Sequence, residues 1–236
     1  MLKAVIFDLD HTLFDRHGTL RAIVPALRRA FRVNPEMSDE EIGAVWCYAD
    51  DRYVYDGWSY ILAYLKEKGV FLSPPEYPDY RSFIYREFAR VAVPFDHTLP
   101  MLEGLKRSGL LVGLVTNGQH ALQYAKLALT GLEYVFDEIV VSGDVGLEKP
   151  DREIFFYACE KLGIEPAEAV YVGDNRKNDI DGAAGAGMRT VWLKSTNPGQ
   201  TGRYEPDAVI ADLRELPEAL KQFGIRNSEL LYRNVF

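Results

Sequence analysis

The sequence predicts an α/β protein with a doubly wound parallel sheet and a separate, inserted helical domain. Short apolar runs rich in Val, Ile and Leu recur along the chain without alternating with polar residues. Such continuous runs are typical of strands that are buried on both faces of a parallel sheet. Segments with helical spacing separate the later runs, which favours right-handed β-α-β units. One long stretch, residues 15–96, interrupts this alternation and accounts for the inserted domain.

The predicted strands and helices follow one another in chain order. The strands are residues 4–7, 110–115, 138–141, 169–172 and 190–193, with a sixth short run at residues 208–210. The helices between them are residues 121–129, 154–162 and 180–186, and a final helix is expected at residues 213–223. A run of small residues, 182–187, suits close packing between helix and sheet. We therefore place a core domain at residues 1–14 and 97–224, and leave residues 225–236 unassigned.

The inserted domain, residues 15–96, shows helical patterns and no convincing strand. It holds 8 of the 14 tyrosines and two of the three tryptophans. Its length exceeds that of a simple crossover, so it should have a small core of its own. Aromatic enrichment allows two interpretations: the rings fill the core of a helical bundle, or several of them line a pocket that faces the sheet.

The composition is that of a globular protein. Of the 236 residues, 47% are hydrophobic and 26% are charged, and the net charge is −8. This sign argues against a nucleic-acid partner or an anionic membrane surface, because both require a positive face. The first ten residues contain a lysine and two aspartates, so they predict neither a signal peptide nor a membrane span. Cys47 and Cys159 lack disulfide or zinc spacing and are expected to be buried thiols. We expect a cytoplasmic protein, either a monomer or a homodimer.

Two aspartates follow the first strand. Asp8 and Asp10 stand at its carboxyl end, and ligands of open parallel sheets bind beyond the carboxyl ends of strands. Two carboxylates in such a place are costly to bury unless they meet a cation. Mg²⁺ prefers oxygen ligands and would relieve their repulsion. The pair alone is also compatible with a solvated turn, so the remaining strand ends decide between the two interpretations.

Polar residues follow the later strands too. Thr116 and Asn117 end the second strand and lead into a helix, where a hydroxyl and backbone amides form a phosphate-binding site. Lys149 stands just before a later helix, and a lysine seen in isolation would be a surface charge. Asp174 and Asp179 follow the fourth strand. Chance explains polar residues at one strand end, but it does not explain polar residues at all of these strand ends in this order.

This order of motifs resembles the haloacid dehalogenase-like hydrolase superfamily, whose members are mostly magnesium-dependent phosphatases with a Rossmann-like core. The resemblance covers the predicted core domain and implies that residues 15–96 form a helical cap of type one. It implies that Asp8 is the nucleophile and Asp10 the acid/base, with Thr12 beside them. His11 departs from the glycine that is frequent at its position, which does little harm to the assignment.

The resemblance implies roles for the other motif residues as well. Thr116 and Lys149 are expected to bind the phosphate, and Asp179 to orient Lys149 or a metal-bound water. The expected ligands of Mg²⁺ are the Asp8 carboxylate, the Asp10 backbone carbonyl and the Asp174 carboxylate.

The implied reaction is hydrolysis of a small phosphomonoester, of the nucleotide or sugar phosphate type, through an aspartyl-phosphate intermediate. Asp10 would protonate the leaving alcohol and then deprotonate the attacking water. The cap would select the leaving group and move as a unit over the site. Tyr53, Tyr55 and Trp58 flank an expected turn at residues 56–57 and are the candidate cap contacts.

Other functions share parts of this pattern. A metal-independent 2-haloacid dehalogenase expels halide without a proton, so Asp10 and the later aspartate pair count against it. A phosphonate hydrolase needs a cap lysine, and Lys66 and Lys68 lie in a charged string that is more typical of a solvated helix face. A sugar phosphomutase shares every core motif. A phosphorylation-switched binding module, the alternative that is not an enzyme, is much shorter and carries its phosphorylated aspartate on a later strand.

Overall fold

The computed structural model describes residues 1–53, 56–194 and 200–225. The chain divides into two compact units. The core unit comprises Met1–Phe14 and Pro94–Phe236, and the insertion unit comprises Asp15–Val93. The insertion was predicted to end at residue 96, whereas the insertion unit ends at Val93. The unassigned closing segment lies outside the described residues, apart from Ile225.

In the described chain, six parallel strands form the sheet of the core unit, in the order β5-β4-β1-β6-β7-β8. The predicted doubly wound parallel sheet is confirmed. β1 is central, so its last residue, Phe7, lies between Leu114 of β4 and Val172 of β6. The strands are β1 (Ala4–Phe7), β4 (Leu111–Thr116), β5 (Glu138–Val141), β6 (Ala169–Gly173), β7 (Arg189–Leu193) and β8 (Ala208–Ile210).

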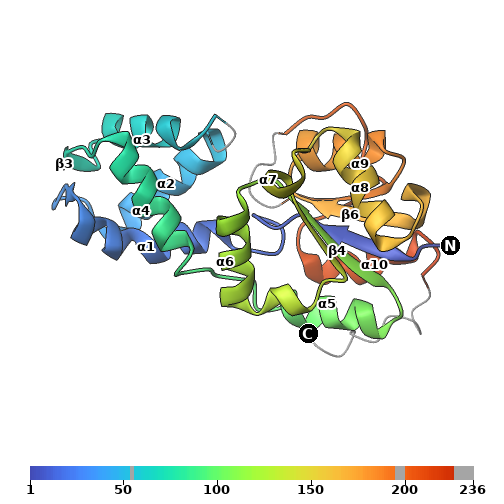
Figure 1. Ribbon diagram of the computed structural model, residues 1–236. Coiled ribbons are helices and arrows are strands. Elements are labelled where there is room, and N and C mark those ends of the chain that lie inside the picture. Colours follow the sequence, from blue (N-terminus) through green and yellow to red (C-terminus); the bar gives the residue numbers. More distant parts are fainter. Residues whose placement is uncertain (54–55, 195–199, 226–236) are drawn as a thin grey trace. The chain divides into compact units, whose positions relative to one another are not determined.

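Helices cover both faces of this sheet, with α8 and α9 on one side and α5 and α10 on the other (Figure 1). The helices of the described core unit are α5 (Thr98–Arg107), α6 (His120–Thr130), α7 (Ser142–Val145), α8 (Arg152–Leu162), α9 (Gly182–Gly185) and α10 (Leu216–Lys221). Shorter turns are η1 (Leu132–Tyr134), η2 (Pro166–Glu168), η3 (Arg176–Asp181) and η4 (Leu213–Glu215).

Some helices differ from the sequence prediction. α5 lies where no helix was predicted. The predicted helix at residues 180–186 is instead the π-helical turn η3 followed by the short α9. Asn175 starts η3, because its side-chain oxygen accepts hydrogen bonds from two following backbone N–H groups. The predicted helix at residues 213–223 divides into η4 and α10, and Asp212 caps the first of these. Capping by the polar side chains of Asn175 and Asp212 sets where η3 and η4 begin. The spacing of apolar residues does not reveal such caps.

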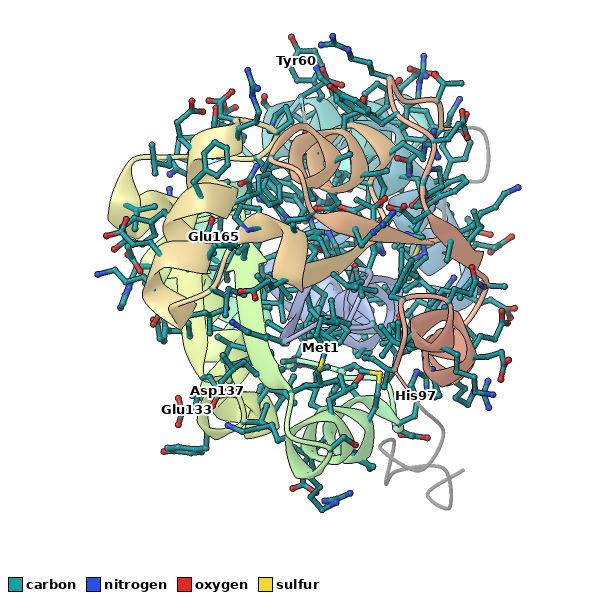
Figure 2. The ribbon with its side chains drawn as sticks, turned by 90° about the vertical axis from the view of Figure 1, so that its right-hand side faces the viewer. Met1, Tyr60, His97, Glu133, Asp137 and Glu165 are labelled. Atoms are coloured by element: carbon teal, nitrogen blue, oxygen red, sulfur yellow. The ribbon has the colours of Figure 1, made fainter. Side chains whose placement is uncertain are left out.

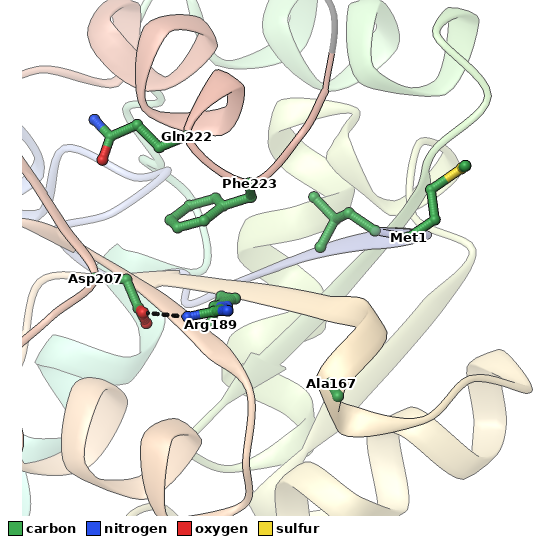
Figure 3. A pocket seen from close by; sticks show the side chains of 7 residues that line it. Met1, Ala167, Arg189, Asp207, Gln222 and Phe223 are labelled. Carbon is green, nitrogen blue, oxygen red and sulfur yellow. Dashed lines mark hydrogen bonds and ion pairs between the residues drawn. The ribbon is translucent and has the colours of Figure 1, made fainter.

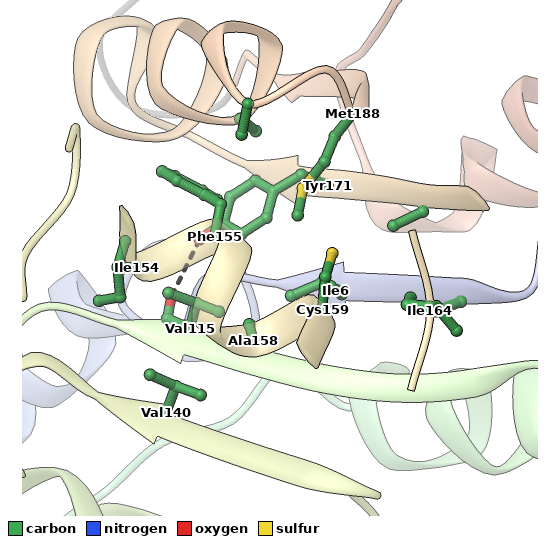
Figure 4. Close-up of a cluster of buried hydrophobic side chains, with 14 residues drawn as sticks. Ile6, Val115, Val140, Ile154, Phe155, Ala158, Cys159, Ile164, Tyr171 and Met188 are labelled. Atoms are coloured by element: carbon green, nitrogen blue, oxygen red, sulfur yellow. Dashed lines mark hydrogen bonds between the residues drawn. The ribbon is translucent and has the colours of Figure 1, made fainter. Parts of the chain in front are cut away.

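An apolar cluster joins α8 to the sheet and supports the strand ends (Figure 4). The rings of Phe155 and Tyr171 meet edge to face, with centroids 5.1 Å apart. The Tyr171 hydroxyl donates a hydrogen bond to the backbone oxygen of Val115 (2.9 Å). Cys159 lies within this cluster at 2% exposure, as predicted for a buried thiol. Burial of α8 in this way holds the loop before it against the sheet.

Glycine is required where α9 approaches α8. A Cβ on Gly182 would lie 2.5 Å from Cε2 of Phe155, which no side chain tolerates without a shift of its surroundings. The small-residue run was predicted to serve contact between helix and sheet. At Gly182 the close contact is with α8 instead.

The insertion unit is helical, with one small sheet that the sequence analysis missed. Its helices are α1 (Arg16–Ala30), α2 (Asp39–Tyr53), α3 (Trp58–Glu67) and α4 (Tyr77–Phe88). β2 (Arg32–Val33) and β3 (Phe71–Ser73) pair antiparallel, so the expectation that this stretch contains no strand is wrong. Strands of two and three residues are too short to show a periodic pattern.

The aromatic rings of the insertion unit divide between its interior and its surface. Trp46 and Tyr80 are fully buried, which confirms the core interpretation for these two rings. Tyr48 and Tyr60 are more than half exposed, and Tyr60 projects from the surface in Figure 2.

A buried ion pair joins α1 to α2, because Arg16 contacts both carboxylate oxygens of Asp50 at 2.6 and 2.8 Å.

Candidate active site

The predicted site residues of the core unit meet at the carboxyl ends of three neighbouring strands. Asp8 follows the central β1, Thr116 ends β4, and Asp174 follows β6. Lys149 comes from the loop before α8. Its side chain reaches the same site, where its ammonium lies 2.5 Å from Asp8 Oδ1. Parallel strands end at one edge of the sheet, so residues far apart in the sequence become neighbours here.

Lys149 is the centre of the buried part of the site. It is 4% exposed, so it is not the surface charge that an isolated lysine would suggest. Its ammonium donates to Asp8 Oδ1 (2.5 Å), to Asp179 Oδ1 (2.7 Å) and to the Tyr171 hydroxyl (3.1 Å). An ammonium has three donors, and these contacts use all of them. Tyr171 was not singled out from the sequence, where it reads as one more apolar residue of its strand.

Three buried carboxylates surround this lysine. Oxygen atoms of Asp8, Asp174 and Asp179 all lie within 4.8 Å of one another. Burial raises the pKa of Asp8 from 3.8 to about 7, although the charge of Lys149 lowers it. Burial, together with the charges of Asp179 and Asp8, also raises the pKa of Asp174 well above its ordinary value. Oxygen donors with this excess of negative charge fit a hard divalent cation such as Mg²⁺.

Backbone geometry holds the Asp174–Asp179 loop close to β6. The Asn175 backbone N–H donates to Asp179 Oδ2 (2.9 Å), and the indole N–H of Trp192 donates to the backbone oxygen of Asp174 (2.8 Å). A Cβ on Gly173 would lie 2.5 Å from Cγ of Asp179. A residue other than glycine at this position would therefore push Asp179 away from Lys149.

Asp10 has different surroundings from Asp8. Its carboxylate receives hydrogen bonds from the Lys126 ammonium at both oxygens (2.8 and 2.9 Å) and from Nε2 of Gln123 (3.2 Å). Gln123 and Lys126 come from α6, and each is only 1% exposed. Sequence reasoning missed both residues. The available signal was their spacing of three on a predicted helix, next to the apolar Leu127 on its buried face.

The two threonines and Asn117 complete the site. Thr12 donates to Asp8 Oδ2 (3.3 Å), and Thr116 accepts a hydrogen bond from Gln123 (2.7 Å). The Asn117 side chain bonds reciprocally with the backbone of Lys149, at 2.9 Å in each direction. Asn117 therefore fixes the loop that carries the lysine.

The turn between the two aspartates and α1 contains one unusual backbone conformation. His11 has φ of 63°, in the left-handed region that favours glycine. The backbone oxygen of Leu9 accepts hydrogen bonds from the N–H groups of Thr12, Leu13 and Phe14. This tight turn explains why glycine suits the position and places Asp10 beside α6.

The candidate contacts of the insertion unit have partners within that unit. Tyr53 stacks against Tyr60, with ring centroids 6.5 Å apart, and contacts the tilted ring of Tyr64 at 5.7 Å. Trp58 meets Phe88 edge to face at 5.7 Å, and the Arg16 guanidinium lies 4.9 Å from its ring. Tyr55 lies outside the described residues.

A shallow hollow of about 460 Å³ lies elsewhere on the core unit (Figure 3). Gln222 and Phe223, which follow α10, line one part of it. The other lining residues, with Met1, Ala167 and Arg189 among them, precede or begin strands of the sheet. These are the amino ends of the strands, whereas the site residues follow the carboxyl ends. In the hollow, Arg189 is paired with Asp207 at 2.9 Å.

Comparison with known proteins gives the family. A model of haloacid dehalogenase-like hydrolases matches residues 5–193, and the chain therefore belongs to this family of hydrolases. It is 30% identical to a glyceraldehyde 3-phosphate phosphatase of Methanopyrus kandleri, over 95% of this chain and 99% of that protein. The predicted membership of the superfamily is confirmed.

Solved structures include both phosphatases and dehalogenases. A crystal structure of a phosphatase of this family from Thermococcus onnurineus is 31% identical, covers 93% of this chain and 98% of that one, and has a TM-score of 0.63. A 2-haloacid dehalogenase from Pseudomonas syringae is 26% identical, covers 94% of this chain and 100% of that one, and has a TM-score of 0.57. The fold is common to both chemistries, so the site residues must distinguish them.

Within the residues that the structure describes, no helix has the length and apolar character needed to cross a membrane.

Proposed function

We propose that this protein is a magnesium-dependent phosphatase that hydrolyses a small phosphomonoester through an aspartyl-phosphate intermediate. The observation that carries the proposal is the difference between two neighbouring aspartates. Asp8 lies among buried carboxylates with Lys149, whereas Asp10 is held separately by Lys126 and Gln123. A cation beside Asp8 would favour its ionised form, which is the form that attacks, and Asp10 stands apart from this buried cluster, where it would exchange a proton with the ester oxygen.

In the first step, a carboxylate oxygen of Asp8 attacks phosphorus and the bond from phosphorus to the ester oxygen breaks. Asp10 gives its proton to that oxygen, which leaves as an alcohol. In the second step, water attacks phosphorus and Asp10 takes the water's proton. Inorganic phosphate leaves and the Asp8 carboxylate is restored.

Positive charge and hydrogen-bond donors support both steps. Lys149 would stabilise the phosphoryl oxygens, and Thr12 and Asp179 would keep Asp8 and Lys149 in position through the contacts described above. Thr116 and the backbone amides after it would bind the phosphate group. The Asn117 side chain is engaged with the Lys149 loop, so its part in phosphate binding would come from its backbone N–H.

The residues that would hold Mg²⁺ are Asp8 and Asp174, through their carboxylates, and Asp10, through its backbone carbonyl. When bound, the ion supplies charge that offsets the repulsion between the carboxylates and the phosphate. The burial of these groups and the raised pKa values of Asp8 and Asp174 support a cation here, because a cation makes their ionised forms favourable.

The proposed substrate is a phosphorylated sugar or a related small metabolite. The relative from Methanopyrus kandleri, matched over nearly its whole length, is named for a phosphorylated three-carbon sugar. The insertion unit would act as the cap that selects the leaving group, with Tyr53 and Trp58 as candidate contacts. A phosphomutase would convert the same substrate class into an isomer, without releasing inorganic phosphate.

Two other activities make different demands on the site. A 2-haloacid dehalogenase has no use for an acid at Asp10 or for the buried Asp174, because halide leaves without a proton. A phosphorylation-switched binding module would keep its phosphoryl group after treatment with acetyl phosphate. A phosphatase instead transfers the phosphoryl group to water and releases inorganic phosphate.

The test is a panel of phosphomonoesters that includes a triose phosphate, a nucleotide and p-nitrophenyl phosphate, each assayed for inorganic phosphate with Mg²⁺ or with EDTA. We expect hydrolysis with Mg²⁺ only, and a loss of at least about 1000-fold in Asp8→Asn, because the nucleophile is removed. Asp79→Asn, an exposed aspartate of α4, is the matched control and should keep wild-type activity.

Wild-type activity in Asp8→Asn would show that the nucleophile is misassigned. Release of chloride from 2-chloropropionate in EDTA would identify a dehalogenase instead. Circular dichroism of each variant confirms that activity is compared between folded proteins.

A further inference from the structure

Helix α6 carries two buried polar side chains that the proposed mechanism does not use. Gln123 and Lys126 lie on the same face as Leu127, and none of the three is more than 1% exposed. An ammonium or an amide is costly to bury unless its donors find partners. The partners of both side chains are therefore informative about why they are there.

Both side chains converge on Asp10. The Lys126 ammonium contacts both oxygens of the Asp10 carboxylate, at 2.8 and 2.9 Å, and lies 5.2 Å from the centre of the Phe14 ring. It also donates to Oε1 of Gln123 (2.8 Å). Nε2 of Gln123 donates in turn to Asp10 Oδ2 (3.2 Å). The Asp10 carboxylate is thus held from two directions.

Gln123 also connects this pair to the end of β4. Its Nε2 lies 2.7 Å from Oγ1 of Thr116 and 3.2 Å from the backbone oxygen of Asn117. Gly118 has φ of 151°, and a Cβ there would lie 3.0 Å from Cδ of Gln123. The backbone turn therefore packs directly on the glutamine side chain and limits its movement.

We propose that Lys126 and Gln123 are positioning residues, which hold the Asp10 carboxylate where it exchanges a proton with the ester oxygen. This inference rests on the proposed phosphatase function. Asp10 stands on a loop, and its side chain is 22% exposed, so these contacts restrain a carboxylate that borders on solvent. Proton transfer requires the acid within hydrogen-bond reach of the leaving oxygen, so loss of this restraint weakens general acid catalysis.

Two esters with different leaving groups distinguish a positioning role of Lys126 and Gln123 from a purely structural role. p-Nitrophenolate leaves readily without a proton, whereas the alkoxide of glycerol 3-phosphate requires one. The value of kcat/KM reports the steps up to the first irreversible one, which is here the departure of the alcohol. A residue that positions the acid therefore affects kcat/KM of the alkyl ester much more than that of the aryl ester.

The experiment measures kcat/KM of Lys126→Met and Gln123→Leu for both esters in the presence of Mg²⁺. For Lys126→Met we expect a loss of about 100-fold or more with glycerol 3-phosphate and of less than about tenfold with p-nitrophenyl phosphate. Gln123→Leu should show the same pattern to a smaller degree, and it keeps the Lys126–Asp10 ion pair, so it serves as the test if Lys126→Met fails to fold. Lys106→Met is the matched control, because Lys106 forms a partly exposed ion pair with Asp137 and makes no contact in this network.

An Asp10→Asn/Lys126→Met double variant completes the test. If Lys126 acts through Asp10, the double variant loses no more kcat/KM on the alkyl ester than Asp10→Asn alone. Equal losses on the two esters, or additive losses in the double variant, would overturn the inference while the phosphatase function stands. A wild-type protein that hydrolyses neither these two esters nor any other phosphomonoester of the panel would overturn the proposed function itself, and the inference with it.

Discussion

At the scale of single residues, the site depends on how one ammonium is shared. Lys149 contacts two carboxylates and the Tyr171 hydroxyl, all of them buried. A lysine suits this position because its ammonium is compact and its three donors point in different directions, whereas the planar guanidinium of arginine would favour a single carboxylate. Burial, together with the charge of neighbouring carboxylates, raises the pKa of both Asp8 and Asp174.

The pKa of Asp8 predicts how stability changes with pH. Burial raises this pKa from 3.8 to about 7, so the folded protein keeps a proton that the unfolded chain loses between these values. The unfolded state then binds fewer protons, and stability falls as pH rises from about 4 to 7, by roughly 4 kcal/mol at most. Without divalent cations, the Tm of wild type should therefore drop more between pH 5 and pH 7.5 than the Tm of Asp8→Asn.

Mg²⁺ should change this comparison in a defined direction. The ion competes with the proton for the same carboxylates, so it should raise the wild-type Tm more at pH 7.5 than at pH 5. Differential scanning fluorimetry of both proteins over this pH range gives the answer. Parallel curves for wild type and Asp8→Asn would show that the Asp8 carboxyl does not carry the effect.

At the scale of secondary-structure elements, α1 and α2 of the insertion unit are joined by both a buried and an exposed arginine–aspartate pair. Arg16 and Asp50 form a bidentate pair with side chains 6% and 0% exposed, and the Arg16 guanidinium also packs against Trp58 and Phe88. Arg28 and Asp39 join the same helices at the surface, with side chains 29% and 51% exposed. The chain thus offers a buried pair and an exposed pair in one structural context.

These two pairs should differ in their contribution to stability. Asp50→Ala leaves the Arg16 charge buried without its carboxylate, so we expect a loss of about 3 to 5 kcal/mol in the free energy of unfolding. Asp39→Ala should cost about 1 kcal/mol or less, because water screens the exposed pair. Urea unfolding of both variants measures the difference. Similar costs would mean that burial does not decide the strength of this contact.

At the scale of the whole molecule, each of the two units has a buried core of its own. The sheet and α8 enclose one, around residues such as Phe155 and Tyr171. Trp46, Tyr80 and Phe83 are buried in the other. We expect units with separate cores to open separately when one of them is weakened, because each core is formed by residues of its own unit.

Hydrogen exchange should reveal this independence in Asp50→Ala. We expect amides of α1 to α4 to lose protection together, while amides of β1, β4 and β6 keep theirs, because the substitution removes a contact within the insertion unit only. Mass spectrometry of peptic fragments separates the two groups. Loss of protection in the sheet to the same degree would show that the molecule unfolds as one cooperative unit.

Much of the core unit follows from local sequence. The predicted strands agree with the observed ones to within a residue, because each is a continuous apolar run bounded by polar or glycine residues. Their polar followers, from Asp8 to Asp179, could be predicted to meet, since parallel strands end at the same edge of a sheet. Chain order and strand direction are sufficient for that conclusion, and both are visible in the sequence.

Other features depend on contacts that no local pattern encodes. β2 and β3 are stabilised by pairing between residues 38 or more positions apart, and neither is long enough to show a period. Gln123 and Lys126 have the composition of an exposed helix face, and only the rotation and depth of α6 against the turn at Asp10 bury them. The sequence by itself determined the sheet, the insertion and the acidic site, because short-range polarity and strand direction define these. The tertiary structure alone decided which cation each carboxylate meets, because that choice depends on distances between elements that are brought together only in the folded chain.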